Sequence, residues 1–538
     1  MRDASQGLKT TFGLLSKTGN EAAVRALVAA LDSPHQTIRD GALVAILKRR
    51  SPAGHREVIR RLHTFDRHWM DLLREHRGRM RQAPRDAILD ADPQVCANGC
   101  RAALWLREYD LMPTLLNALE DPANPNADLV AETLRELVEQ LHEELSDPGG
   151  EVDHRATRLF RDHVVSALES SLGRFARHQR REVVEAFVLL ASRDNAVLKQ
   201  VLQSAHHAAF VTVVDVLSKG TGGGIVRLLL GFLDDPHAPS AALSVIAKRS
   251  DLKFIRYLLR KIGRDPSLLS AQNLKRIRAV GWLQTGPSLL EQLDEAAQHG
   301  VVRLVMASGI PRLQAFNTIE HLMLHGKREG RRAASAALAE FQGAAANALA
   351  LRALEDEDPQ VQANILSQLR RRGIPGVLPR MVEMLDSRHA VVRQAARKSL
   401  SEFTFARFLG AFDMLDEEVR RSTGALVKKV DPETVPRLRA ELESRVRTRR
   451  LRGLTIARTL DLVEPLEARI IDLLGDRDHL VRAEAALALA GCASESSRQA
   501  LREAESDRSE TVQRAVQSSL SQLEQFSQWR DTLADPRD

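Results

Sequence analysis

The chain has 538 residues, of which 43% are hydrophobic, 28% are charged and only 4% are aromatic. One ordinary compact core does not accommodate this length, and the hydrophobic content excludes wholesale disorder, so we expect several domains or an open-ended array of repeats. The scarcity of aromatic residues argues against β-sandwiches and leaves few platforms for stacking bases or flat cofactors. The formal net charge of +7 favours acidic partners only weakly.

The cysteine content and the amino terminus concern the cellular compartment. Cys96, Cys100 and Cys492 are too few for a disulfide framework, and a reducing compartment fits them best. A secretion signal has a continuous apolar core behind a basic head, and the opening stretch "MRDASQGLKTTFGLLSK" has no such core. No window approaches the roughly 20 apolar residues that span a bilayer. We therefore expect a cytoplasmic protein without membrane insertion.

Basic residues concentrate in the segment 48–85. It holds twelve lysines and arginines against four acidic residues, and this excess of eight exceeds the charge of the whole chain. Such a segment could lie along the phosphates of nucleic acid or an acidic protein surface. The residues singled out for that role are Arg60, Arg61, Arg67, Trp69, Arg74, Arg77, Arg79 and Arg81. The favoured interpretation is plainer: a solvated helix whose arginines cover apolar surface and pair with neighbouring acids.

The glycine-rich stretch "SKGTGGGIVRLLL" (218–230) precedes a predicted helix, where exposed amides could hold a phosphate. It lacks the Gly-Lys-Ser/Thr of a nucleotide-binding loop, because Ile225 and Val226 stand there and no strand comes before. A flexible loop between helices is the favoured interpretation.

Two pairs of residues at helical spacing have the chemistry of metal ligands. His321 and His325 could share a metal, but Leu322 occupies the place of the glutamate that a zinc-protease motif requires. Cys96 and Cys100 could meet on one helix face, but no second cysteine pair or nearby histidine completes a tetrahedron. We expect no metal, no cofactor and no catalytic site.

A pattern recurs along the chain: a Leu-rich helix, an acidic turn, then Val or Ile with a polar residue, and a helix of small residues. Clear copies are "LDSPHQTIRDGALVAIL" (31–47), "LEDEDPQVQANILSQL" (354–369), "LDSRHAVVRQAARKSL" (385–400), "LDEEVRRSTGALV" (415–427) and "LLGDRDHLVRAEAALALAG" (473–491). Alignment on Val361, Val392, Val419, Val446, Val481 and Val512 gives separations of 31, 27, 27, 35 and 31 residues. The turn aspartates are placed to cap the second helix, and Gly309 and Gly373 to end helices in left-handed conformations. These lengths predict two-helix units stacked as a solenoid.

This pattern resembles HEAT repeats, most closely the bacterial variant that also occurs in phycobilin-lyase-like proteins. The resemblance implies an all-α fold, an α-solenoid of antiparallel helix pairs of about 30 residues each. It also implies a ladder between adjacent units formed by the turn aspartate and the following arginine, which here are Asp386 with Arg393 and Asp476 with Arg482.

The organisation that we predict has four parts: 1–145, HEAT-like repeats with the basic insertion 48–85; 146–265, degenerate helical repeats; 266–525, further HEAT-like repeats; and 526–538, a tail. The leading functional hypothesis is a non-enzymatic scaffold or adaptor that binds a protein partner along the solenoid surface. One alternative is a nucleic-acid-binding protein that uses 48–85. The other is an enzyme of the lyase-like HEAT group.

Overall fold

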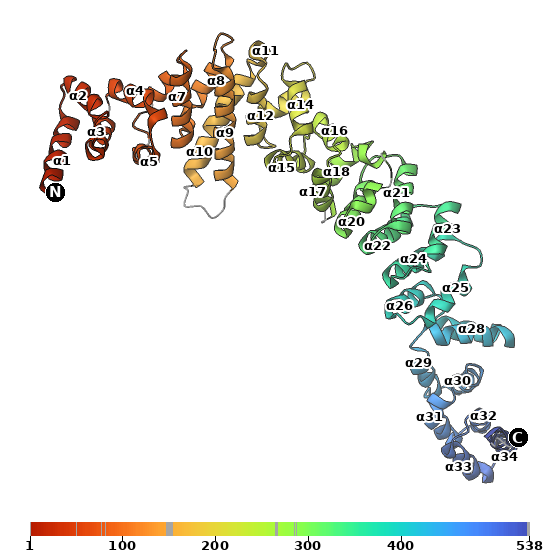
Figure 1. The fold of residues 1–538 in the computed structure, drawn as a ribbon. Helices are drawn as coiled ribbons and strands as arrows, with labels where there is room; N and C mark the ends of the chain where they lie inside the picture. The colour runs from red at the N-terminus through yellow and green to blue at the C-terminus, as the bar shows by residue number, and fades with distance from the viewer. Residues whose placement is uncertain are drawn as a thin grey trace. The chain divides into compact units, whose positions relative to one another are not determined.

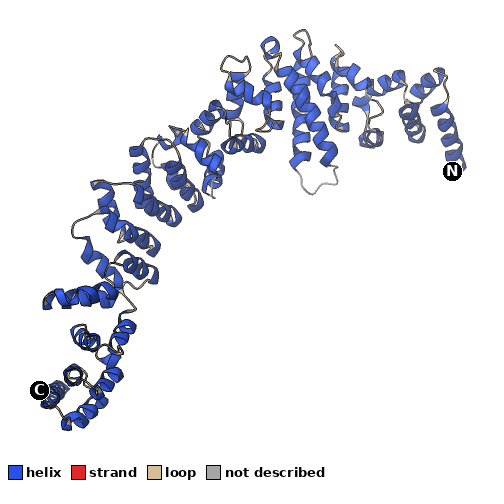
Figure 2. Cartoon of the chain, turned by 180° about the vertical axis from the view of Figure 1, so that it is seen from behind, coloured by secondary structure: helices blue, strands red, loops and turns tan. Residues whose placement is uncertain are grey.

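The computed structural model describes residues 2–49, 51–76, 78–80, 82–146, 154–263, 267–284, 286 and 288–534. Within these ranges it contains 34 α-helices, ten short 3₁₀ helices and no strand (Figures 1 and 2). The predicted all-α class is thus confirmed. The chain divides into two compact units, unit 1 (residues 1–318) and unit 2 (residues 319–538).

Unit 1 holds twenty complete α-helices in its described part. They are α1 Arg2–Lys17, α2 Ala22–Ala30, α3 Gln36–Arg49, α4 Pro52–Arg60, α5 Arg67–Glu75, α6 Gln82–Ile88, α7 Pro93–Leu106, α8 Met112–Glu120, α9 Ala127–Ser146, α10 His154–Leu172, α11 Phe175–His178, α12 Arg181–Leu190, α13 Ala196–Gln203, α14 Phe210–Lys219, α15 Gly223–Gly231, α16 Ser240–Lys248, α17 Leu252–Gly263, α18 Leu268–Lys275, α19 Ser288–Gln292 and α20 Glu295–Ala307.

The next helix, α21 (Arg312–His325), contains the boundary between the units. Unit 2 continues with α22 Arg328–Ala337, α23 Ala344–Ala353, α24 Pro359–Arg372, α25 Val377–Glu383, α26 Ala390–Ser399, α27 Phe405–Ala411, α28 Glu417–Val430, α29 Thr434–Leu442, α30 Arg447–Thr459, α31 Glu467–Asp472, α32 His479–Leu489, α33 Glu495–Glu503 and α34 Glu510–Ala534.

The acidic turns start helices, because their aspartates cap free backbone amides. Asp358 accepts a hydrogen bond from the Gln360 amide at 2.8 Å, and Asp478 accepts one from the Leu480 amide at 2.9 Å. Asp416 does the same at the start of α28. An N-cap of this kind typically contributes about 1 kcal/mol to helix stability.

The glycines predicted to end helices have two different roles. Gly373 ends α24 with a φ of 61°, as predicted. Gly309 does not have a positive φ; its amide donates to the Ile277 carbonyl, and a Cβ there would lie 2.4 Å from the Lys275 carbonyl oxygen. The close approach of two backbone segments therefore requires glycine at this position.

Helices pack against their neighbours in the chain. In unit 2, α24 packs on α22 and α26, and α32 packs on α30 and α34, while α23, α29 and α33 each pack on the helix that follows. The buried core follows this pattern, since one cluster runs from Phe405 to Leu523 and a separate one in unit 1 from Leu27 to Leu106. A stack of helix pairs that bury their faces against adjacent pairs is a solenoid.

Among the described residues, no single helix has the length and apolar composition to cross a membrane. One bent pair, Phe210–Lys219 with Gly223–Asp234, reaches those thresholds only when its halves are combined, and the halves meet at 112°.

Candidate binding surfaces

Unit 2 contains three ion pairs that each tie one repeat to the next. Arg482 donates to both carboxylate oxygens of Asp507, from Nε at 2.7 Å and from Nη2 at 2.8 Å. Arg450 donates from Nη2 to Asp476 at 3.1 Å, with Nε 2.8 Å from the other carboxylate oxygen, and Arg331 lies 3.1 Å from Asp356. The partners are 25 or 26 residues apart, so each pair joins one turn to the helix of the preceding unit.

The same arginines close their own turns. Arg482 donates from Nη1 to the Asp476 carbonyl, and Arg450 donates to the Ser444 carbonyl, both at 2.9 Å and both six residues earlier in the chain. Arg450 thus occupies the position that Arg482 occupies in its repeat. Val446, which we aligned on sequence, is instead the exposed N-cap of α30. Moving the marker from 446 to 449 changes the flanking separations from 27 and 35 to 30 and 32.

Asp386 and Arg393 are arranged differently. Arg393 donates to the Ser387 carbonyl at 2.8 Å and so closes its own turn, as Arg482 does. Asp386 ends a short 3₁₀ helix and pairs with Lys429 of α28 at 2.6 Å. The structure therefore places Asp476 and Arg482 in two neighbouring rungs of the ladder, whereas Asp386 is tied by a lysine.

Part of the basic segment 48–85 is held inside unit 1. Arg61 pairs with Asp32 of the preceding turn at 2.5 Å. Trp69 packs edge-on against Phe65, with ring centroids 4.7 Å apart, and its indole N–H donates to Asp40 at 2.7 Å. These contacts hold the indole against α3 and give it a packing role.

The rest of the segment faces solvent. Arg60 lies 3.3 Å from Glu57 in a surface pair, a type worth about 0 to 1 kcal/mol. Arg67, Arg74 and Arg79 are exposed, and their side chains make no ion pair or hydrogen bond with the described residues. Arg77 and Arg81 lie outside the described residues.

A groove of about 600 Å³ lies between α2 and α4, and the α4 side of it belongs to this segment. Its charged side chains are four arginines and two carboxylates: Arg25, Arg56, Arg60, Arg61, Asp32 and Glu57. Both carboxylates lie against arginines, Asp32 against Arg61 and Glu57 against Arg60. Arg25 and Arg56 are exposed and lack a carboxylate among the residues described.

The two residue pairs with the chemistry of metal ligands each lie on a single helix, the cysteines on α7 and the histidines on α21. Cys96 and Cys100 are both buried in α7, where the neighbouring Cys100 thiol and burial raise the pKa of the Cys96 thiol far above its ordinary value, and Cys96 Sγ donates to the Ile88 carbonyl at 3.4 Å. The rings of His321 and His325 are tilted by 40° to each other, with centroids 5.0 Å apart. Over the described ranges, no group of three or more His, Cys, Asp or Glu side chains could hold a metal ion.

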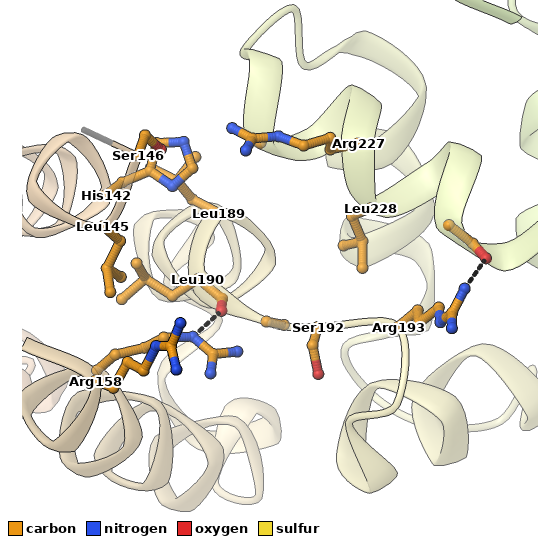
Figure 3. Close-up of a pocket in the computed structure, with 14 residues that line it drawn as sticks. His142, Leu145, Ser146, Arg158, Leu189, Leu190, Ser192, Arg193, Arg227 and Leu228 are labelled. Atoms are coloured by element: carbon orange, nitrogen blue, oxygen red, sulfur yellow. Dashed lines mark hydrogen bonds between the residues drawn. The ribbon is translucent and has the colours of Figure 1, made fainter. Parts of the chain in front are cut away.

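The feature that sequence reasoning missed is a cavity of about 410 Å³ in unit 1, which we call the arginine pocket (Figure 3). Helices α9, α10, α12 and α15 line it, together with the residues that follow α12. Its lining residues are His142, Leu145 and Ser146 of α9; Arg158 and Arg161 of α10; Leu189 and Leu190 of α12 with Ala191, Ser192 and Arg193 after it; and Gly224, Arg227, Leu228 and Gly231 of α15.

Backbone carbonyls hold two of these arginines in position. Arg161 donates from Nε to the Leu190 carbonyl at 3.1 Å, and Arg193 donates from Nη1 to the Gly231 carbonyl at 3.4 Å. In Figure 3, Arg227 and His142 lie on one side of the cavity and Arg158 and Arg193 on the other. Burial, and secondarily the charge of Arg227, lower the pKa of His142, so at neutral pH its imidazole is neutral.

The glycine-rich stretch 218–230 supplies one wall of this pocket. A Cβ at Gly224 would lie 2.9 Å from both His142 Cε1 and Leu189 Cδ1, so glycine lets α15 approach α9 and α12 closely. The loop before α15 is anchored by buried Arg249, which donates to the Leu217 and Gly220 carbonyls at 3.0 and 2.7 Å. The stretch therefore contains a short connection between α14 and α15, as expected, and its first residue, Gly220, is held by Arg249.

Comparisons with known proteins concern the repeats. The family model described as HEAT repeats matches residues 318–401. A search of curated proteins found no match. Among solved structures, a chain from a complex of Kap95p with RanGDP is 12% identical, with a TM-score of 0.27, over 94% of this chain and 82% of that one. A chain from a structure of the cadherin and β-catenin interaction is 14% identical, with a TM-score of 0.29, over 93% and 99%.

Kap121p is 12% identical with a TM-score of 0.21, and the match covers 96% of this chain and 57% of Kap121p. We draw no functional conclusion from structural likenesses with TM-scores this low. The identification rests on the matched repeats, the stacked helix pairs and the Arg–Asp rungs of unit 2. Residues 318–401 thus match HEAT repeats, and the described helix pairs form an all-α solenoid.

Proposed function

We propose that the chain is a non-enzymatic scaffold that binds a protein partner along the surface of its helix pairs, and that an acidic segment of this partner lies in the groove between α2 and α4. The observation that carries the proposal is the charge of that groove, in which Arg25 and Arg56 are exposed and pair with no carboxylate of the described residues. Complementary charge at a protein interface speeds association and selects partners more than it raises affinity.

The contrast with unit 2 supports this proposal. There, three arginines at the starts of repeat helices are engaged by carboxylates: Arg331 by Asp356, Arg450 by Asp476 and Arg482 by Asp507. A neutralised ladder of that kind stabilises the stack. Arginines left unpaired on a groove contribute nothing comparable to the stack and are available to a partner.

The test is affinity capture from native lysate, with and without nuclease, using the full chain and a charge-reversed variant, Arg25→Glu with Arg56→Glu. We expect a defined protein partner that survives nuclease and is depleted at least tenfold in the variant. The matched control, Arg67→Glu with Arg74→Glu on α5, carries the same charge change outside the groove and should retain the partner. Equal capture by both variants would contradict the proposal.

A second candidate, binding of nucleic acid, is favoured by the exposed arginines Arg67, Arg74 and Arg79. Contacts to phosphates release counterions, so the affinity should fall steeply as salt rises. Neutralising all three residues to Gln should reduce the slope of log affinity against log salt by roughly one for each arginine that had bound a phosphate. Salt-insensitive binding, or none, would exclude this candidate.

A further inference from the structure

Among the residues that the structure describes, the arginine pocket has an excess of positive charge. Four guanidinium groups line it, and none of the described lining residues carries a carboxylate. The two acids beside it, Asp162 and Asp194, lie 3.2 Å from Arg161 and 3.7 Å from Arg193, and both are largely exposed. Glu143 follows His142 on α9 but lies outside the lining. Counted over the described residues, four positive charges against two neighbouring negative ones leave an excess of two.

Arg158 of α10 and Arg227 of α15 extend into the pocket from different walls. The side chains of Arg158 and Arg227 are exposed and bond to no described residue. Holding like charges around one cavity is unfavourable unless an anion neutralises them. Each guanidinium presents paired N–H donors whose geometry matches two oxygens of a phosphate group.

The apolar part of the lining limits what kind of anion fits. Leu145, Leu189, Leu190 and Leu228 form the remaining wall, and the volume of about 410 Å³ lies in the range of small-molecule sites. A bare inorganic ion would leave this wall uncovered. An anionic group attached to carbon would place its charge on the arginines and its carbon atoms on the leucines.

We propose that the arginine pocket binds a phosphomonoester. A phosphomonoester carries a charge of about −1.5 to −2 near neutral pH, which balances the excess of two. Arg158 and Arg227 donate to the phosphate from opposite walls, while Arg161 and Arg193, held by the Leu190 and Gly231 carbonyls, supply further donors. Small sugar phosphates and phosphorylated side chains share this chemistry.

The experiment is calorimetric titration of the purified full chain, at fixed ionic strength, with two probes: ribose 5-phosphate and a short peptide containing phosphoserine. Ribose and the unphosphorylated peptide serve as blanks. We expect saturable binding of at least one phosphorylated probe with a dissociation constant below about 1 mM. The tighter probe then identifies the source of the phosphate.

The variant Arg158→Gln with Arg227→Gln removes the two arginines that make no internal bond, so it should fold normally. It should weaken binding by at least about tenfold for each arginine, the usual loss for a charge-assisted hydrogen bond. The control Arg67→Gln with Arg74→Gln has the same net charge and should bind like the unaltered chain. Binding of neither phosphorylated probe, or equal weakening in both variants, overturns the proposal. Since the assay needs no partner protein, its failure would leave the scaffold proposal standing.

Discussion

At the scale of single residues, Arg482 shows how a charged side chain can stabilise this fold from within. It is 4% exposed, it binds both oxygens of Asp507, and it also donates to the Asp476 carbonyl. The paired charges also hold the pKa of the Asp507 carboxyl below its usual range, chiefly through the hydrogen bond from Arg482. Removing the arginine would leave a largely buried carboxylate and a turn carbonyl without their donor.

We therefore expect Arg482→Ala to lower the local free energy of opening of α32 and α34 by about 3 kcal/mol, the lower end of the range for breaking a buried pair. Amide hydrogen exchange measures this free energy helix by helix. Arg514→Ala is the matched control, because Arg514 and Glu510 form a pair whose side chains are 74% and 76% exposed. The control should change stability by less than about 0.5 kcal/mol, and a similar loss in both variants would contradict this account.

The burial of His55 and the partial burial of His142 make the stability of the fold depend on pH. Burial lowers the pKa of His55, against a smaller opposing effect of hydrogen bonds with the Ile46 and Leu47 backbone, and burial also lowers the pKa of His142. Between the lowered pKa values and the ordinary 6.5, the unfolded chain binds more protons than the folded one. The free energy of unfolding therefore decreases as pH falls below 6.5, and the loss is complete once pH is below the folded-state values.

The measurement is the thermal unfolding midpoint at pH 7.5 and pH 5.5 for the unaltered chain and for His55→Gln. We expect the drop between the two pH values to be smaller in the variant, because the protonated form no longer has to be buried there. Exposed His35 provides the control, and His35→Gln should leave the drop unchanged. An identical drop in all three proteins would show that burial of His55 does not control it.

At the scale of helices, small residues set how closely neighbouring helices approach. Gly300 of α20 faces Leu259 of α17, and a Cβ at Gly300 would lie only 2.2 Å from the Leu259 carbonyl oxygen. The obstacle is backbone, which cannot move aside as a flexible side chain can. Gly410 of α27 is exposed, and a Cβ there would meet nothing within 4 Å.

The same substitution should therefore have opposite effects at the two sites. Gly300→Ala should force α17 and α20 apart and destabilise unit 1 by about 2 kcal/mol, within the range for overpacking. Gly410→Ala should stabilise α27 by about 0.5 kcal/mol, because alanine loses less backbone entropy on folding than glycine. Hydrogen exchange in the affected helices tests both, and destabilisation by Gly410→Ala would contradict the steric argument.

The helices could be predicted from sequence wherever their signals are local. The turn aspartates Asp358, Asp416 and Asp478 cap helices within three residues of themselves, so the starts of α24, α28 and α32 follow from short stretches. Val446 was misaligned because a valine after an acidic turn resembles the marker, whereas the position is defined by the bond from Arg450 to the Ser444 carbonyl. That bond depends on the path of the turn, which the sequence pattern alone does not specify.

The arginine pocket could not be predicted, because its residues form a binding site only when the fold brings their helices together. Arg158 and Arg227 are 69 residues apart and come from different helices, with no regular spacing between them. Two signals were present: the acidic-turn pattern fades over 146–265, and glycines precede α15. Interpreted singly, the first suggested degenerate repeats and the second a flexible loop. The division of the chain into 1–145, 146–265, 266–525 and 526–538 stays a prediction.

At the scale of the whole molecule, a solenoid lacks the long-range contacts that make a compact domain cooperative. Stability is close to a sum of the repeats and the interfaces between neighbours, so a local defect should stay local. We expect Arg482→Ala to raise hydrogen exchange in α30 to α34 and to leave exchange in α7 to α12 of unit 1 unchanged. Increased exchange across both units would show cooperative unfolding of the whole chain and would contradict nearest-neighbour stabilisation.

The small sequence separation of the Arg–Asp ion pairs also affects how the protein folds during its synthesis. Arg450 meets Asp476 after 26 further residues, and Arg482 meets Asp507 after 25, so a rung needs only the next repeat to have left the ribosome. Folds built from contacts close in sequence form quickly, and chains generally fold from the amino terminus during synthesis. Each repeat can thus be locked by its successor while translation continues, and the nascent chain exposes about one unfinished apolar face at a time to chaperones.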